Sequence, residues 1–191
     1  FSSTVDSTGG ARDLTVSAST GAITFTGTVG GTAALDALAL NSTGTTTLTA
    51  AVTAGSLATN AGGTTAINGG AVTTTGAQTY NDNVTLGANT ALSATTTTFN
   101  GTVAGGGFNL GLTANAVFGD ATTATVTGLG TLAVSGTTTI NTATVTSAGT
   151  QTYNGAATLG ADTTLTTTDS TVLFSSTVDS TGGARDLTVS A

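Results

Sequence analysis

The side chains available for chemistry in this chain are nine aspartates, two arginines, two tyrosines and the hydroxyls of serine and threonine. Lysine, glutamate, histidine, cysteine and methionine are absent from the 191 residues. These missing types supply most of the acids, bases, nucleophiles and metal ligands that enzymes use. We therefore predict that the chain is not an enzyme and carries no cofactor, and we assign no residue a catalytic, cofactor-binding or metal-binding role.

Two acidic turns are the strongest candidates for an ion site, and each lies between a pair of aspartates: Asp6 and Asp13 in the first, Asp179 and Asp186 in the second. Carboxylate and carbonyl oxygens of such a turn can bind Ca²⁺. The calcium-binding nonapeptide GGxGxDxUx is not matched: with its aspartate aligned on Asp13, Ala11 stands where its third glycine would be and Thr8 where its first would be. The sequence favours a solvated turn in which Arg12 pairs with a neighbouring aspartate.

Three other motifs point to structure rather than to chemistry. Enzymes that cleave pectin on parallel β-helices need basic residues beside clustered aspartates, whereas Arg12 and Arg185 are copies of one position in a repeated segment. No lysine follows the triple glycine at 105–107, so we predict a corner there and not a phosphate-binding loop. Tyr80 and Tyr153 stand in matching QTYN contexts and are predicted to be core residues, not platforms for sugars.

The composition limits how the chain can bury apolar groups. Threonine fills 52 positions and glycine 28, while charged residues make up 6% and aromatic residues 4%. A hydrophobic content of 38% is too high for simple disorder, but bulky side chains are too few for a thick core. The net charge of -7 argues against nucleic acid or an anionic membrane as partner, and no apolar run is long enough to insert into a membrane.

Internal repeats organise the whole chain. Residues 1–18 recur without a change at 174–191, which is a period of 173. Within that period, residues 63–90 align without gaps to residues 136–163, and 17 of the 28 positions agree. We predict one continuous segment over residues 1–191, made of a 173-residue repeat (1–173) and the start of the next copy (174–191), with both ends lying inside a longer polypeptide.

A finer period is marked by large apolar side chains, at successive steps of 24, 23, 19, 13, 19, 19, 22, 13 and 21 along the chain: Phe1, Phe25, Leu48, Ile67, Tyr80, Phe99, Phe118, Ile140, Tyr153 and Phe174. Steps of about 20 residues suit one coil of a solenoid, and we interpret the 13-residue steps as two strands of one coil. The residues between them alternate as strands do and are rich in β-branched types, with glycine, asparagine and aspartate as punctuation. Only residues 32–40 have a helix-forming composition, and we expect another strand and turn there.

These periods predict an all-β fold, a parallel β-solenoid (right-handed β-helix) of about 9–10 coils. One coil of about 20 residues cannot bury its own apolar face, so it becomes stable only when neighbouring coils stack on it. The large residues would then form one inward ladder, with threonine on the outside. The alternative fold, a string of antiparallel β-sandwich repeats of about 70–90 residues, needs hairpin turns that the motif spacing does not favour.

The phrases FxGTV (residues 25–29 and 99–103) and GGTTxINGGxVTTxGxQTYNxxVTLGAxT (62–90) resemble the β-strand repeats of very large bacterial surface proteins. They are similar to those of filamentous haemagglutinin-type and autotransporter adhesins. The resemblance covers most of the chain. It implies a right-handed β-helical shaft, secretion to the bacterial cell surface, and a role in adhesion, biofilm or sheath formation.

We therefore expect an extracellular, non-catalytic shaft of a fibre or adhesin. Its partners would be neighbouring repeats of the same chain or identical chains stacked end to end, and host-cell or matrix surfaces. An ice-binding solenoid is the main alternative, since threonine tracts occur at 45–47, 73–75, 95–98, 137–139 and 166–168. These tracts differ in phase and the coil length varies, so we expect no uninterrupted threonine array. A matrix or sheath protein is a further alternative.

Overall fold

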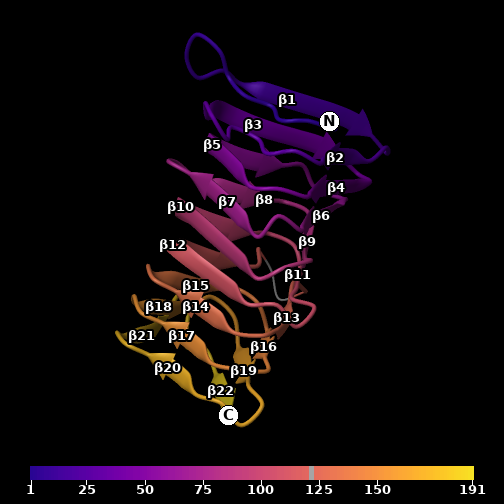
Figure 1. Ribbon diagram of the computed structural model, residues 1–191. Coiled ribbons are helices and arrows are strands. Elements are labelled where there is room, and N and C mark those ends of the chain that lie inside the picture. The colour runs from indigo at the N-terminus through magenta and orange to yellow at the C-terminus, as the bar shows by residue number, and fades with distance from the viewer. Residues whose placement is uncertain (121–122) are drawn as a thin grey trace.

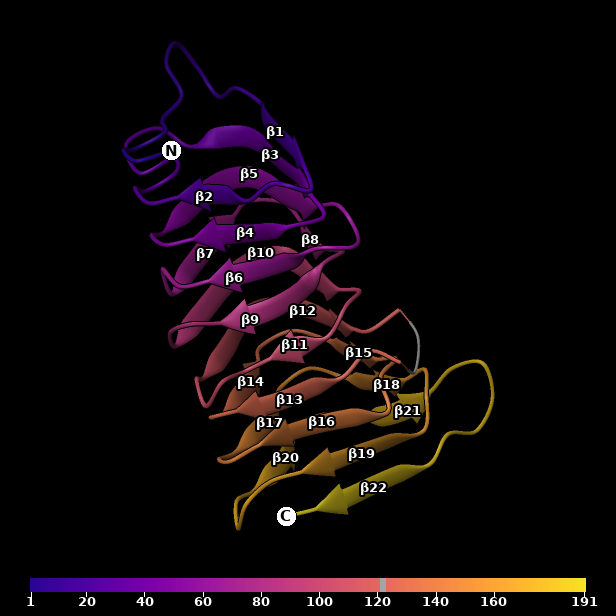
Figure 2. The same cartoon turned by 90° about the vertical axis from the view of Figure 1, so that its right-hand side faces the viewer.

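The computed structural model describes residues 1–120 and 123–191, and in these residues it contains 22 strands and no helix. The strands stack into one elongated solenoid (Figures 1 and 2), which confirms the predicted fold class. All the strand pairs are parallel, from the first coils to the last. Antiparallel β-sandwich repeats are therefore excluded for this part of the chain.

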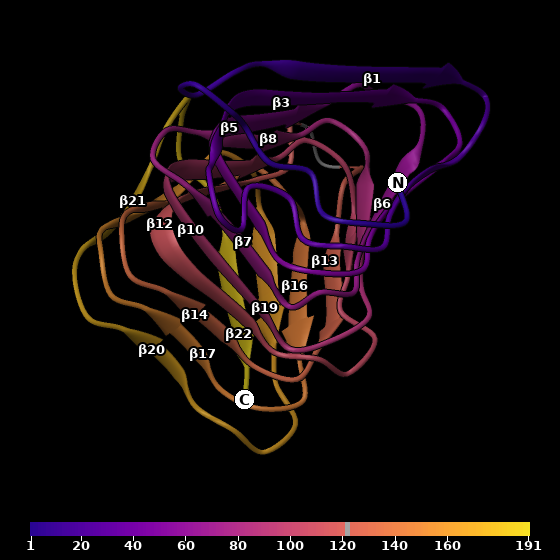
Figure 3. The same cartoon turned by 45° about the horizontal axis from the view of Figure 1, so that its top comes forward.

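Each coil passes through three strand positions, which we call face 1, face 2 and face 3 in chain order. Faces 1 and 2 form one 13-stranded sheet that bends at a corner, and face 3 is a separate nine-stranded sheet. The tilted view shows the coils enclosing the core from these sides (Figure 3). Face 3 has one strand in each coil, so its nine strands show that the described residues form nine coils.

Face 1 begins with the isolated bridges of Val5, Val29 and Val52, and continues with β7 (Ala71–Thr74), β14 (Leu132–Val134), β17 (Gln151–Tyr153) and β20 (Val172–Phe174). Face 2 contains β1 (Leu14–Ser19), β8 (Gln78–Tyr80), β15 (Thr138–Ile140), β18 (Ala157–Leu159) and β21 (Val178–Ser180). Four longer strands run around the corner between these two faces: β3 (Leu35–Ser42), β5 (Val52–Thr59), β10 (Thr90–Phe99) and β12 (Leu110–Phe118). Residues 32–40 thus contribute to a strand, as predicted.

Face 3 contains β2 (Ile23–Phe25), β4 (Thr45–Leu48), β6 (Thr64–Ile67), β9 (Asn83–Leu86), β11 (Val103–Ala104), β13 (Val126–Leu129), β16 (Thr144–Ser147), β19 (Thr163–Thr166) and β22 (Leu187–Ser190). Paired residues on this face are 18 to 24 positions apart in the chain, from the Leu129–Ser147 pair to the Leu165–Val189 pair. The corners absorb this variation in coil length. Strands in successive coils therefore stay aligned.

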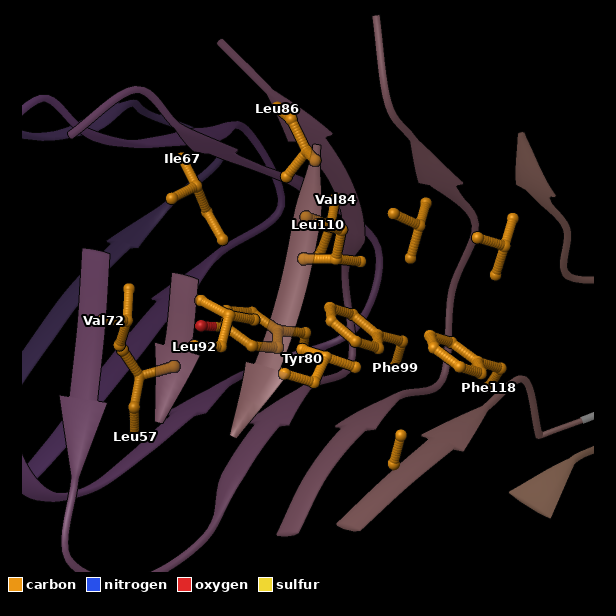
Figure 4. Packing of buried hydrophobic residues seen from close by; sticks show 14 of the residues in the cluster. Leu57, Ile67, Val72, Tyr80, Val84, Leu86, Leu92, Phe99, Leu110 and Phe118 are labelled. Atoms are coloured by element: carbon orange, nitrogen blue, oxygen red, sulfur yellow. The ribbon is translucent and has the colours of Figure 1, made fainter. Parts of the chain in front are cut away.

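The core is a column of alternate side chains from all three faces. Along β12, for example, Leu110, Leu112, Ala114, Ala116 and Phe118 are buried and the residues between them are less so. This in–out alternation is the reason that a β-branched, threonine-rich sequence folds as strands here, because each strand has one wet and one dry side. Large side chains lie above one another in the core (Figure 4).

The large apolar residues form three stacks and not the one ladder that we predicted. Phe1 and Phe25 stack at the end of face 3, where Phe25 is continued by Leu48 and Ile67. Tyr80, Phe99 and Phe118 stack on face 2, with ring centroids 5.3 and 5.7 Å apart, and Tyr153 stacks on Phe174 on face 1. The stack changes face at each 13-residue step, because such a step spans two strands and a full coil spans three. A 13-residue step is therefore two thirds of a turn, and its two large residues lie in successive coils and not in two strands of one coil.

Four large hydrophobic side chains are exposed among the described residues, and all belong to the outermost coils: Phe1, Leu173, Val178 and Val189. One more coil would cover Phe1, Val178 and Val189, which continue inward-facing stacks. Leu173 lies in register with Thr152 on the outer side of face 1. The strands at both ends also present unpaired backbone groups, which are templates for further pairing.

Candidate functional site

The first acidic turn, residues 6–13, is a loop at the corner between faces 1 and 2 and is exposed from Thr8 to Asp13. Oδ1 of Asp6 accepts hydrogen bonds from the backbone N–H groups of Thr32 (2.9 Å) and Ala33 (3.2 Å) in the next coil. These bonds favour the charged carboxylate and lower the pKa of Asp6. Oδ1 of Asp13 accepts from the N–H of Ala37, 3.1 Å away. Both carboxylates therefore bond to the neighbouring coil, in place of the predicted pairing with Arg12.

The second acidic turn repeats this loop at the other end of the molecule. Its glycines, Gly182 and Gly183, have φ values of 72° and 123°, close to the 69° and 116° of Gly9 and Gly10. Asp179 accepts from the N–H of Ser180 within its own coil. The two copies thus share one turn conformation, although their aspartates have different partners.

Asparagine and aspartate side chains at other corners also bond from coil to coil. Oδ1 of Asn83 accepts from the N–H of Thr102 at 2.9 Å, and Oδ1 of Asp162 accepts from the N–H of Asp186 at 3.1 Å. The Nδ2 group of Asn100 donates to Oδ1 of Asn81 at 2.6 Å. Asn83 and Asp162 thereby satisfy backbone N–H groups between strands, whereas Asn100 and Asn81 bond side chain to side chain. Their role in the fold is to join coils.

Asp82 is the one buried carboxylate among the described residues, with an exposed fraction of 1%. Its Oδ1 accepts from the N–H of Gly63 at 2.8 Å, and its Oδ2 accepts from the hydroxyl of Thr65 at 3.2 Å. Burial nevertheless raises the pKa of Asp82, because desolvation outweighs these two bonds. No sequence pattern singles out this aspartate, which lies beside Asn81 in a corner.

Two buried glutamines form the most completely bonded polar groups of the core. Nε2 of Gln78 donates to the carbonyl oxygens of Val72 and Ser93, both at 3.0 Å, and its Oε1 accepts from the Tyr80 hydroxyl at 3.1 Å. Burial raises the pKa of Tyr80 above its usual value. Tyr80 and Tyr153 are fully buried, which confirms that they are core residues.

Gln151 makes the same set of contacts in the second copy of the internal repeat, to the carbonyl oxygens of Val145 (3.3 Å) and Thr166 (2.9 Å) and to the hydroxyl of Tyr153 (3.0 Å). We did not predict this role for the glutamines. The signal was present in the sequence, since the QTY triplet recurs in both copies of the internal repeat.

Threonine hydroxyls form rows on the outside of face 3. Residues in direct register follow one another from coil to coil, first as Thr24, Thr47, Ala66, Thr85, Ala104 and Thr127, and again as Thr146, Thr166 and Ser190. A second, parallel row contains Thr45, Thr64 and Asn83, and again Thr144, Thr164 and Thr188.

A register shift between Val126 and Leu129 separates the two halves of these rows. As predicted, the threonine tracts differ in phase, and they therefore lie on different faces of the solenoid. Variation in coil length, however, does not break the rows, because the corners absorb it. The expectation of no uninterrupted threonine array is confirmed for face 3, because Ala66, Ala104 and the register shift interrupt the rows.

The described residues enclose no pocket and contain no group of three or more metal-ligating side chains. Gly105–107 forms a corner, as predicted, with φ values of 59° at Gly106 and 86° at Gly107. Within the described part of the chain, no helix is long and apolar enough to cross a membrane. Comparison with family models, with curated proteins and with solved structures finds no match to this chain.

Proposed function

We propose that this chain is a structural segment of an extracellular shaft, in which 173-residue repeats stack end to end to build a fibre or an adhesin. The observation that carries the proposal is the unbroken parallel pairing of nine coils, with large apolar side chains exposed only at the two ends of the described chain. The partner that fits each end is another coil of the same kind, because it continues both the strand ladder and the side-chain stacks.

The shaft role agrees with the distribution of the few charged residues. Asp6 and Asp13 hold the backbone of the next coil, and the faces themselves carry mostly hydroxyls. Such a rod supplies length and stiffness, while recognition of a host-cell or matrix surface resides in other domains or in many weak contacts. The resemblance to bacterial adhesin repeats supports a location at the bacterial cell surface.

The shaft proposal is tested by electron microscopy and limited proteolysis of the purified chain. We expect rods roughly 40 Å long for nine coils spaced about 4.8 Å apart, and longer filaments where rods join at their ends. Trypsin should cut only after Arg12 and Arg185, which lie in the exposed loops. Compact globules, or rapid degradation of the coils between the loops by a protease of broad specificity, would contradict the proposal.

A second candidate function, ice binding, is favoured by the threonine rows of face 3. Where threonines are direct neighbours, as in the Thr24–Thr47 and Thr45–Thr64 pairs, their hydroxyls lie about 4.8 Å apart across the strands and about 6.6 Å apart along them, a spacing that can order water. Replacing Thr47 and Thr85 by leucine should abolish any thermal hysteresis, whereas the same change at Thr79 and Thr98, which are paired on face 2, should leave it unchanged. The absence of thermal hysteresis in the unmodified chain would exclude this candidate.

A further inference from the structure

The two identical copies of the 18-residue segment lie on different faces of the solenoid. Val5 pairs with Val29 on face 1 of the first coil. Its equivalent in the second copy, Val178, pairs with Ala157 on face 2 of the ninth coil. The same residue of the repeat has thus moved by one face around the axis.

The strand that follows shows the same displacement. Thr15 in β1 pairs with Ala39 on face 2, whereas Thr188 in β22 pairs with Thr164 on face 3. From the first coil to the ninth, one period of the long repeat therefore advances the chain by eight full coils and one additional face. The repeat does not contain a whole number of coils.

The internal 73-residue repeat gives independent support that one sequence can occupy different faces. Gln78 lies on face 2 and Gln151 on face 1, yet their side-chain amides bond to equivalent atoms. In each case the partners are the carbonyl oxygens of the residues six positions before and fifteen positions after the glutamine, and the hydroxyl of the tyrosine two positions after it. The contacts of the module therefore do not depend on the face. All three faces offer the same parallel ladder, the same in–out alternation and a corner at each end, so the chain has no local means to distinguish them.

We propose that successive 173-residue repeats enter the shaft rotated by one face, so that the exposed loop of residues 6–13 winds around it as a three-fold screw. This inference rests on the proposed function, because it requires that repeats are joined in one stack. Eight and one-third coils correspond to an axial step of roughly 40 Å, and the same face returns after three repeats, roughly 120 Å along the axis.

The rotation has a consequence for how such a shaft meets other surfaces. Each repeat contributes one loop with an arginine and two aspartates, and the loop of the next repeat points a third of a turn away. A long shaft therefore presents these loops on all sides rather than along one edge. Weak contacts made by the loops would be available in every direction, and a single adhesive face would not exist.

Disulfide cross-linking tests the rotation directly, because the chain has no cysteine of its own. In the first variant, Thr188→Cys is combined with Thr164→Cys, which is the neighbour of residue 188 if the second copy is rotated. In the second variant, Thr188→Cys is combined with Thr158→Cys on face 2 of the preceding coil, which would be the neighbour of residue 188 without rotation. All three positions are threonines that are at least partly exposed, so the two pairs are matched. Neighbouring parallel strands lie within the Cα separation that a disulfide allows. The pair Thr15→Cys and Ala39→Cys reports the same geometry in the first copy.

Mild oxidation followed by non-reducing electrophoresis should show an intramolecular disulfide in the 164/188 and 15/39 pairs and none in the 158/188 pair. Circular dichroism and electron microscopy of the same samples report whether each variant remains a β-rich rod. A disulfide in the 158/188 pair alone, equal disulfide formation in both pairs, or none in the 164/188 pair of a folded rod overturns the rotation while leaving the shaft intact. Compact particles in every sample would instead contradict the shaft itself.

Discussion

The buried glutamine Gln78 offers the sharpest test of how the core is held together. Gln78→Leu removes an acceptor from the Tyr80 hydroxyl and a donor from two carbonyl oxygens, those of Val72 and Ser93. Both side chains are completely buried, so water cannot replace these bonds. Three lost bonds of about 1 kcal/mol each give an expected loss of about 3 kcal/mol in local stability.

The double variant separates the hydrogen bond from the change in packing. Tyr80→Phe alone should cost about 1 kcal/mol, because it leaves Oε1 of Gln78 without its donor. In the Gln78→Leu, Tyr80→Phe double variant, no hydroxyl is left unpaired. We therefore expect the double variant to be less destabilised than the sum of the single variants, by about 1 kcal/mol.

Native-state hydrogen exchange is the suitable assay, because coils of a solenoid open locally and a single unfolding free energy is poorly defined. A loss of about 3 kcal/mol should speed exchange of the amides of β7, β8 and β10 roughly 100-fold. Gln151→Leu, with the same contacts on another face, should instead affect β16, β17 and β19. Unchanged exchange in Gln78→Leu, or strict additivity with Tyr80→Phe, would refute the reasoning.

Burial and close contact lead to three further predictions. Burial raises the pKa of Asp82. The contribution of Asp82 to the free energy of unfolding is therefore greatest below the usual pKa of 3.8, and it is lost as pH rises through the pKa of the folded state. Asp82→Asn should remove this decrease in stability with pH, as measured by urea unfolding at acidic and neutral pH. Gly155→Ala should destabilise, since its Cβ would lie 2.3 Å from a backbone oxygen of the preceding coil, whereas Gly111→Ala, with 3.9 Å to its nearest atom, should be tolerated in thermal unfolding. Burial also raises the pKa of Tyr80 and Tyr153, so ultraviolet titration should show no ionisation near pH 10 until the chain unfolds, and normal titration would contradict their burial.

Most of the fold could be predicted from local patterns. The alternation around Phe25 and Phe99 specifies strands with one buried side, and both side chains are buried as predicted. The spacing of the large residues indicated the length of a coil. The bond of Gln78 to Ser93 and that of Asp82 to Gly63 could not be predicted, because these partners are 15 and 19 positions away and their register is fixed only when coils stack.

The sequence by itself determined that this chain forms strands, that the strands stack as coils, and that few side chains remain for chemistry. These features depend on residue type and on spacings within one coil. Only the tertiary structure decided which face each strand occupies, and therefore that the large residues form three stacks and that the copies at 1–18 and 174–191 lie on different faces. The physical reason is that the three faces make the same local demands on the sequence, so a residue's face follows from the number of strands that precede it.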